Sequence, residues 1–72
     1  MNGSAHQLTY RVDGMSCEHC RVAITDEVGS LSGVDSVDVD LDRKLVTVRG
    51  DGLGDDAVRA AIDEAGYDAV PA

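Results

Sequence analysis

The sequence predicts an α+β fold in which four short strands form one antiparallel sheet and two helices cover one of its faces. Three stretches alternate apolar and polar residues, which is typical of strands with one buried face. Two other stretches repeat apolar residues at every third or fourth position, which is typical of helices with one buried stripe. With a short segment near the C-terminus as the fourth strand, the order is β-α-β-β-α-β. Four short strands alone would leave an apolar face in water, so both helices must pack on that face.

The first strand and the first helix flank the two cysteines of the chain. The strand is predicted over residues 7–12, and Asp13 and Gly14 end it. From Ser16, the predicted N-cap, the period becomes helical. Gly33 helps to end this helix. The predicted buried stripe contains side chains three or four positions apart, namely Cys20, Ile24, Val28 and Leu31.

A β-hairpin and a second helix form the rest of the chain. Strands are predicted over residues 34–41 and 44–49, joined by a short turn at residues 42–43. The second helix is predicted over residues 55–65 and the last strand over residues 67–70. The helix is expected to turn one apolar face inward, formed by Val58, Ala61, Ile62 and Ala65.

This order of elements is that of the ferredoxin-like split βαβ fold. If the first strand runs up, the first, third and fifth connections all lie at one end of the molecule. Residues 13–20, 40–44 and 65–68 are therefore predicted to meet there.

Length and composition limit the classes of function. A chain of 72 residues forms one domain, predicted over residues 7–70 between a flexible tail at 1–6 and a short tail at 71–72. The net charge is −8 and Phe and Trp are absent, so we expect no nucleic-acid binding, which needs clustered cations or stacking aromatics. No apolar run approaches the roughly 20 residues that span a bilayer, so no membrane insertion is expected. The start lacks the features of a signal peptide, which favours a cytoplasmic location.

The chemistry of the chain is concentrated in "DGMSCEHC", residues 13–20. In a reducing compartment a lone cysteine pair is more often metal-binding or catalytic than a structural disulfide. Cys17 and Cys20 lie three positions apart at a helix start, where the helix dipole and free N–H groups favour thiolates. Two thiolates are an incomplete site for zinc, which prefers four ligands, and they suit a soft ion such as Cu(I).

This stretch resembles the metal-binding motif G-M-T/S-C-x-x-C of the heavy-metal-associated domain family, which includes bacterial copper metallochaperones and the N-terminal modules of copper-transporting P-type ATPases. The resemblance covers residues 7–70. It implies that Cys17 and Cys20 hold Cu(I) and pass it to a partner domain with a similar pair. Tyr67 is similar to the tyrosine of bacterial members. Beyond the motif at residues 14–20, the matching positions are Ile24, Val28, Leu31, Gly33, Val34, Val46, Thr47, Val48, Ile62, Gly66 and Tyr67.

Several neighbours of the pair are candidates for accessory roles. Met15 is expected to lie under the loop as a flexible core residue more than as a ligand. His19 could be a third ligand, could bridge metal in a dimer, could tune the thiolates through its own protonation, or could be an exposed loop residue. Tyr67 is expected to shield the metal or to hydrogen-bond near a sulfur, and Arg21 could offset the charge of the site. Charged residues of the hairpin could guide docking to a partner, namely Asp40, Asp42, Arg43 and Lys44.

The sequence therefore predicts a cytosolic Cu(I) metallochaperone that transfers copper by thiolate ligand exchange to the N-terminal metal-binding domain of a copper-transporting P-type ATPase. Such a carrier needs no general base or substrate pocket, so no enzyme activity is expected. The alternative is that the chain is itself such an ATPase module. Two rivals are a Zn(II), Cd(II) or Hg(II) binder and a thiol oxidoreductase. Thioredoxin-like oxidoreductases place a proline against the active site, whereas the only proline here, Pro71, lies far from the cysteines in the sequence. A metal-bridged homodimer is a further alternative.

Overall fold

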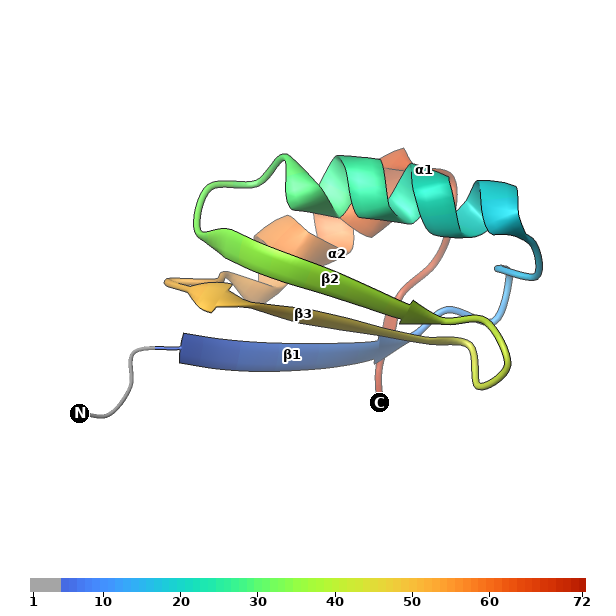
Figure 1. The fold of residues 1–72 in the computed structure, drawn as a ribbon, viewed down its shortest axis with the longest axis horizontal. Coiled ribbons are helices and arrows are strands. Elements are labelled where there is room, and N and C mark those ends of the chain that lie inside the picture. The colour runs from blue at the N-terminus through green and yellow to red at the C-terminus, as the bar shows by residue number, and fades with distance from the viewer. Residues whose placement is uncertain (1–4) are drawn as a thin grey trace.

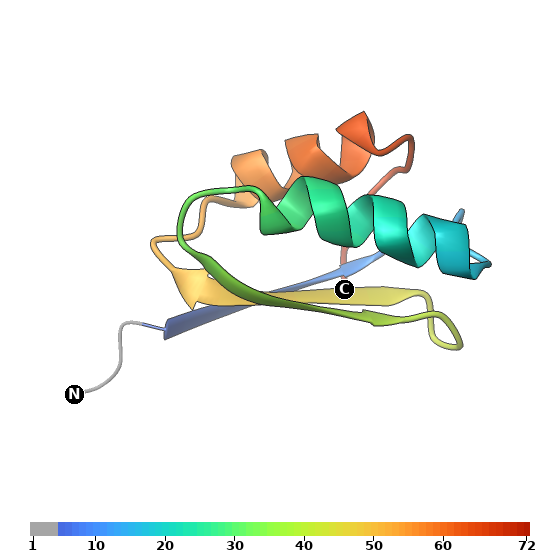
Figure 2. The ribbon, with the colours of Figure 1, turned by 45° about the horizontal axis from the view of Figure 1, so that its top comes forward.

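The computed structural model describes residues 5–72 and confirms the predicted fold class. All strand pairs are antiparallel, and the strand order in the sheet is β2-β3-β1-β4. Both helices lie on the same side of this sheet (Figures 1 and 2). In chain order the elements are β1 (Ala5–Arg11), α1 (Glu18–Gly29), β2 (Val34–Asp40), β3 (Leu45–Asp51), α2 (Asp55–Glu64) and β4 (Val70–Pro71).

Strand β1 begins earlier than predicted, because its central position gives it a long partner. It pairs with β3 from Ala5 opposite Asp51 to Arg11 opposite Leu45. The strand therefore includes the last two residues of the segment predicted as an N-terminal tail. Residues 1–4 of that predicted tail lie outside the described residues.

The start of α1 differs from the prediction that Ser16 is its N-cap. The N-cap is Cys17, whose backbone is extended at φ −146° and ψ 173°, and no side chain caps the helix. The carbonyl oxygen of Cys17 accepts hydrogen bonds from the N–H groups of Cys20 at 3.1 Å and Arg21 at 3.3 Å. The helix ends at Gly29, before Leu31, which still packs against the core.

The prediction of a last strand over residues 67–70 is wrong in its bounds. The N–H of Tyr67 donates to the carbonyl of Ile62 at 3.2 Å, so the chain is still leaving α2 there. Pairing with β1 begins only at Val70, and Pro71 is part of the strand although it was predicted to be in the C-terminal tail. The short β4 leaves Tyr67 in a connection near the cysteines.

The core lies between the sheet and the two helices. Tyr10 is buried in it, and its hydroxyl donates to Asp55 Oδ1 at 2.5 Å, which joins the middle of the sheet to the start of α2. No helix in residues 5–72 has the length and apolar composition needed to cross a membrane. The buried side chains are Tyr10, Val12, Met15, Cys20, Ile24, Val28, Val46, Val48, Val58, Ala61 and Ile62.

Candidate metal site

The loop between β1 and α1 is anchored in the core on the N-terminal side of the cysteines. Val12 and Met15 are both fully buried, and the N–H of Met15 donates to the carbonyl of Val12 at 3.2 Å. The prediction that Met15 is a core residue is thus confirmed. After these two anchors residues 16–19 are exposed, so Cys17 lies on the surface where the helix begins.

The two cysteines are free thiols with different environments. Cys17 is exposed at the N-cap, whereas Cys20 is only 7% exposed in the first turn of α1. Their Sγ atoms lie 3.5 Å apart. Two sulfurs at this separation can bind one soft ion together, with one sulfur open to an approaching partner and the other shielded.

Tyr67 comes from the opposite end of the chain to the same site. It follows Gly66, whose φ of 97° lets the chain turn sharply at the end of α2. Its ring lies against residues 12–17, the loop between β1 and α1, which is called the metal loop below. A Cβ atom added to Gly14 would be 3.6 Å from Tyr67 Cδ1. The predicted meeting of residues 13–20 and 65–68 at one end of the molecule is thereby confirmed.

The electrostatics of the site favour a thiolate at Cys20. A hydrogen bond from the Tyr67 side chain, together with backbone hydrogen bonds from Ser16 and Cys17, lowers the pKa of Cys20 to about 6. Partial burial opposes this shift. The same bond to Cys20 raises the pKa of Tyr67, because the phenol must keep its proton in order to donate it. A pKa of about 6 favours the thiolate form of Cys20 at neutral pH, and the thiolate is the form that binds metals.

The other predicted site residues of the loop and helix lie on the surface. His19 is exposed, and Arg21 forms an ion pair with Glu18 on the outside of α1. Within residues 5–72 no three His, Cys, Asp or Glu side chains converge as a metal-binding group.

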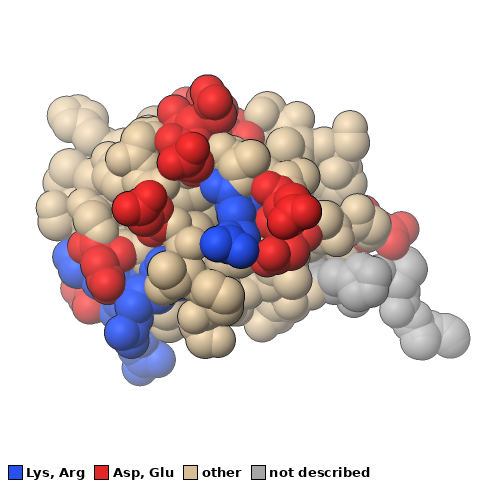
Figure 3. All heavy atoms as spheres, turned by 180° about the vertical axis from the view of Figure 1, so that it is seen from behind, with Lys and Arg blue, Asp and Glu red and all other residues tan. Residues whose placement is uncertain are grey.

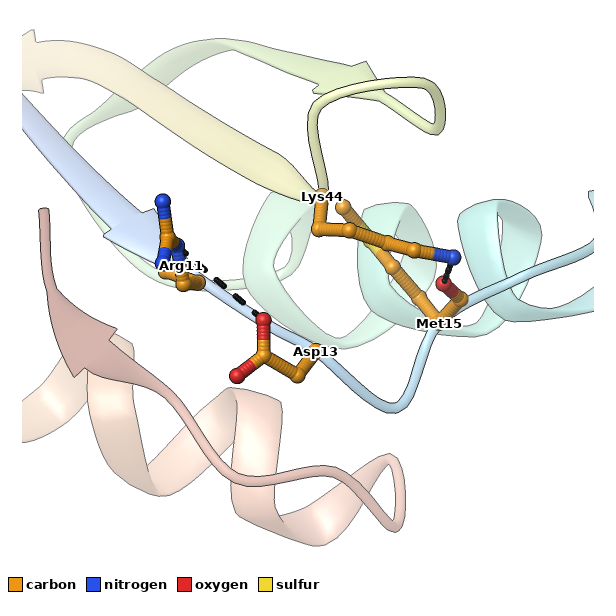
Figure 4. A network of polar contacts seen from close by, with 4 residues as sticks. All are labelled: Arg11, Asp13, Met15 and Lys44. Atoms are coloured by element: carbon orange, nitrogen blue, oxygen red, sulfur yellow. Dashed lines mark hydrogen bonds and ion pairs between the residues drawn. The ribbon is translucent and has the colours of Figure 1, made fainter.

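The hairpin residues divide into two groups. Asp40 accepts a hydrogen bond from the N–H of Arg43 at 3.1 Å and forms a 4.0 Å ion pair with its guanidinium, and Asp42 is exposed. Lys44 instead reaches the metal loop, where its Nζ donates to the carbonyl of Met15 at 2.7 Å (Figure 4). Nothing in the local sequence indicates this contact, because the two residues are joined only through the pairing of β1 with β3.

Comparisons with known proteins agree with this geometry. A sequence profile of the heavy-metal-associated domain matches residues 9–68. The copper chaperone CopZ of Staphylococcus haemolyticus is 42% identical over 59 residues, which cover 79% of this chain and 87% of that protein. CopZ of Bacillus subtilis is 41% identical over 64 residues, covering 86% of this chain and 93% of the relative. A solved structure of a CopZ metallochaperone is 36% identical and superposes with a TM-score of 0.86, covering 90% of this chain and all of that chain. This chain belongs to the heavy-metal-associated domain family.

Proposed function

We infer that this protein is a cytoplasmic Cu(I) chaperone, a carrier and not an enzyme, that binds copper through Cys17 and Cys20. The observation that carries this inference is the pair of Sγ atoms 3.5 Å apart, one exposed and one buried. The lowered pKa of Cys20 favours its thiolate form. Thiolates are soft donors and suit Cu(I), which accepts a low coordination number. The similarity to the CopZ copper chaperones supports the choice of copper.

Binding is expected to move the exposed sulfur. With a thiolate–metal bond of about 2.3 Å, as zinc has, linear coordination would place the two sulfurs about 4.6 Å apart. The observed separation is 3.5 Å, so the pair must open for linear binding. Cys17 is the residue free to rotate outward, because Cys20 is held by Tyr67 and by the first turn of α1.

Copper leaves by ligand exchange. A thiolate of the partner attacks the copper beside the exposed Cys17 and forms a three-coordinate centre with three sulfurs. The bond from copper to Cys17 then breaks, a second partner thiolate binds, and the bond to Cys20 breaks last. Copper stays Cu(I) throughout, so no electron is transferred and no oxidant is required.

The partner is a domain that presents a similar cysteine pair, and the N-terminal metal-binding domain of a copper-transporting P-type ATPase has this chemistry. Asp and Glu side chains form several separate groups on the face seen from behind Figure 1, with Lys and Arg side chains beside them (Figure 3). The net charge is −8, so encounter with a partner depends on charge complementarity. The docking candidates in this proposal are Arg21, Asp40, Asp42, Arg43 and Lys44.

Anaerobic competition with a chromogenic Cu(I) chelator tests the binding step. The wild-type protein should remove one Cu(I) from the chelator, and Cys17→Ser with Cys20→Ser should abolish this. His19→Ala, in the first turn of α1, tests the predicted third ligand, and X-ray absorption of the loaded protein reports whether a nitrogen ligand is present. An unchanged affinity in the double serine variant would refute the site.

Transfer is tested separately by mixing the loaded protein with an isolated ATPase metal-binding domain and separating the two by ion exchange. Copper should move to the domain without loss to a chelator in solution. If the protein binds copper tightly but exchanges none, it is a binding module and not a donor. The alternative that this chain is itself an ATPase module predicts that a separate chaperone loads it.

A further inference from the structure

Lys44, at the end of the β2–β3 turn, donates a hydrogen bond to the loop between β1 and α1 that leads to Cys17. It directly precedes β3, and its own carbonyl accepts a hydrogen bond from the N–H of Val12 at 2.8 Å. Its ammonium crosses to the carbonyl of Met15 at 2.7 Å, as Figure 4 shows. Lys44 thus contacts both buried anchors of the loop, Val12 and Met15, and Met15 is only two positions before Cys17.

The ammonium group of Lys44 forms no ion pair with a carboxylate of residues 5–72. Among residues 5–72 the ion pairs are formed by arginines, namely Arg11, Arg21, Arg43 and Arg59, each with an Asp or Glu. Lys44 is half-buried and its hydrogen bond goes to a neutral carbonyl. A hydrogen bond from a charged donor is stronger than one between neutral groups, and the unneutralised charge acts over the neighbouring loop.

The backbone of Lys44 points to the same role. Its φ is 61°, the only positive value at a non-glycine residue in the described part of the chain. Glycine and asparagine adopt this left-handed conformation more readily than lysine does. An unfavourable local conformation is retained where the side chain or backbone has a use that offsets it.

We propose that Lys44 is a positioning residue for copper binding: its ammonium fixes the loop before Cys17 in the metal-free protein and partly offsets the negative charge of the copper bis-thiolate. This inference rests on the proposed binding of Cu(I) by Cys17 and Cys20. It adds to the docking role predicted for Lys44 a function inside the molecule, because the side chain is turned onto its own loop.

The decisive comparison is Lys44→Met against Arg43→Met. Both variants remove one positive charge from adjacent hairpin residues, but the side chain of Arg43 is 79% exposed and is paired with Asp40. Chelator competition should show that Lys44→Met lowers Cu(I) affinity about tenfold, with Arg43→Met within about twofold of wild type. Lys44→Arg, which keeps a charged donor, should restore affinity to within about threefold.

Lys44→Asn separates positioning from general stability. Asparagine accepts the left-handed backbone, so the urea midpoint should stay at or above that of wild type while copper affinity falls as in Lys44→Met. In the metal-free protein, amide hydrogen exchange at Met15 and Cys17 should accelerate severalfold in both variants. Exchange at Val12, whose partner is the backbone of residue 44, should be unchanged.

Two failures are distinguishable. If wild type binds Cu(I) but Lys44→Met matches Arg43→Met in affinity and in loop exchange, the positioning role is refuted and the proposed function stands. If wild type binds no Cu(I), the proposed function fails. Unchanged amide hydrogen exchange at Met15 in metal-free Lys44→Met would also refute the positioning of the loop by Lys44.

Discussion

The side chain of Tyr67, from the α2–β4 turn, interacts with the thiol of Cys20, the buried member of the cysteine pair, and lowers its pKa. This contact is the largest cause of the lowered pKa of Cys20. It also couples two distant parts of the chain, because Tyr67 packs against Gly14 in the metal loop. The first predictions follow from this pair.

Replacing Tyr67 by Phe should raise the pKa of Cys20 from about 6 toward the ordinary thiol value of 9.0, since its main hydrogen-bond donor is lost. Ultraviolet absorbance of the thiolate, followed against pH in the metal-free protein, measures this. Tyr10→Phe is the matched control, because that hydroxyl binds Asp55 and not a cysteine. An unmoved titration in Tyr67→Phe would show that the backbone N–H groups alone stabilise the thiolate.

Stability of the metal-free protein should depend on the ionisation of Cys20. Its folded pKa of about 6 lies below its ordinary value of 9.0, so ionisation favours the folded state. This contribution is fully present above pH 9 and is lost as the pH falls to about 6. Urea denaturation between pH 6 and 9 should show a rise in the free energy of unfolding that Cys20→Ser lacks. Equal pH profiles for the two proteins would contradict the assignment.

Copper binding should weaken in acid for the same reason. Below about pH 6 a proton competes with copper for Cys20, so chelator competition should show affinity falling as the pH is lowered. In Tyr67→Phe the fall should begin at a higher pH. A pH-independent affinity between 5 and 8 would exclude proton competition at Cys20.

Tyr10→Phe should destabilise the fold by about 1.5 kcal/mol without changing copper affinity. The hydroxyl is lost from a buried ring, and Asp55 at the start of α2 loses a 2.5 Å hydrogen bond. Burial and this bond also raise the pKa of Tyr10, so the phenol keeps its proton and donates it to Asp55. Urea denaturation measures the cost, and a loss below about 0.5 kcal/mol would mean that water replaces the bond fully.

The close approach of β2 and β3 should make Gly50 intolerant of any side chain. A Cβ atom there would lie 2.0 Å from the carbonyl oxygen of Gly33, so the strands would have to separate. Gly50→Ala should cost more than about 2 kcal/mol, at the upper end of ordinary substitutions. Gly29→Ala is the control: nothing lies within 4 Å of its added Cβ, and alanine in a helix should stabilise by about 0.5–1 kcal/mol. Equal urea midpoints for the two variants would contradict the close approach.

Local pattern was sufficient for the elements, because each depends on residues near one another in the chain. The stretches predicted as strands from their alternation do bury alternate side chains, among them Tyr10 in β1 and Val46 and Val48 in β3. The stripe of Cys20, Ile24 and Val28 is buried as predicted. The ends of the elements were less predictable: a serine hydroxyl at residue 16 suggested a cap, but the chain begins the helix one residue later without a side-chain cap.

The sequence by itself determined the order of the elements, the inward faces and the cysteine pair at a helix start, since periodicity and local backbone preference encode these directly. Only the tertiary structure decided that Tyr67 reaches the thiol of Cys20 and that Lys44 donates to the carbonyl of Met15. Those relationships join residues far apart in the chain. They depend on the register of β1 with β3 and on the turn that follows α2, which bring segments distant in the chain together.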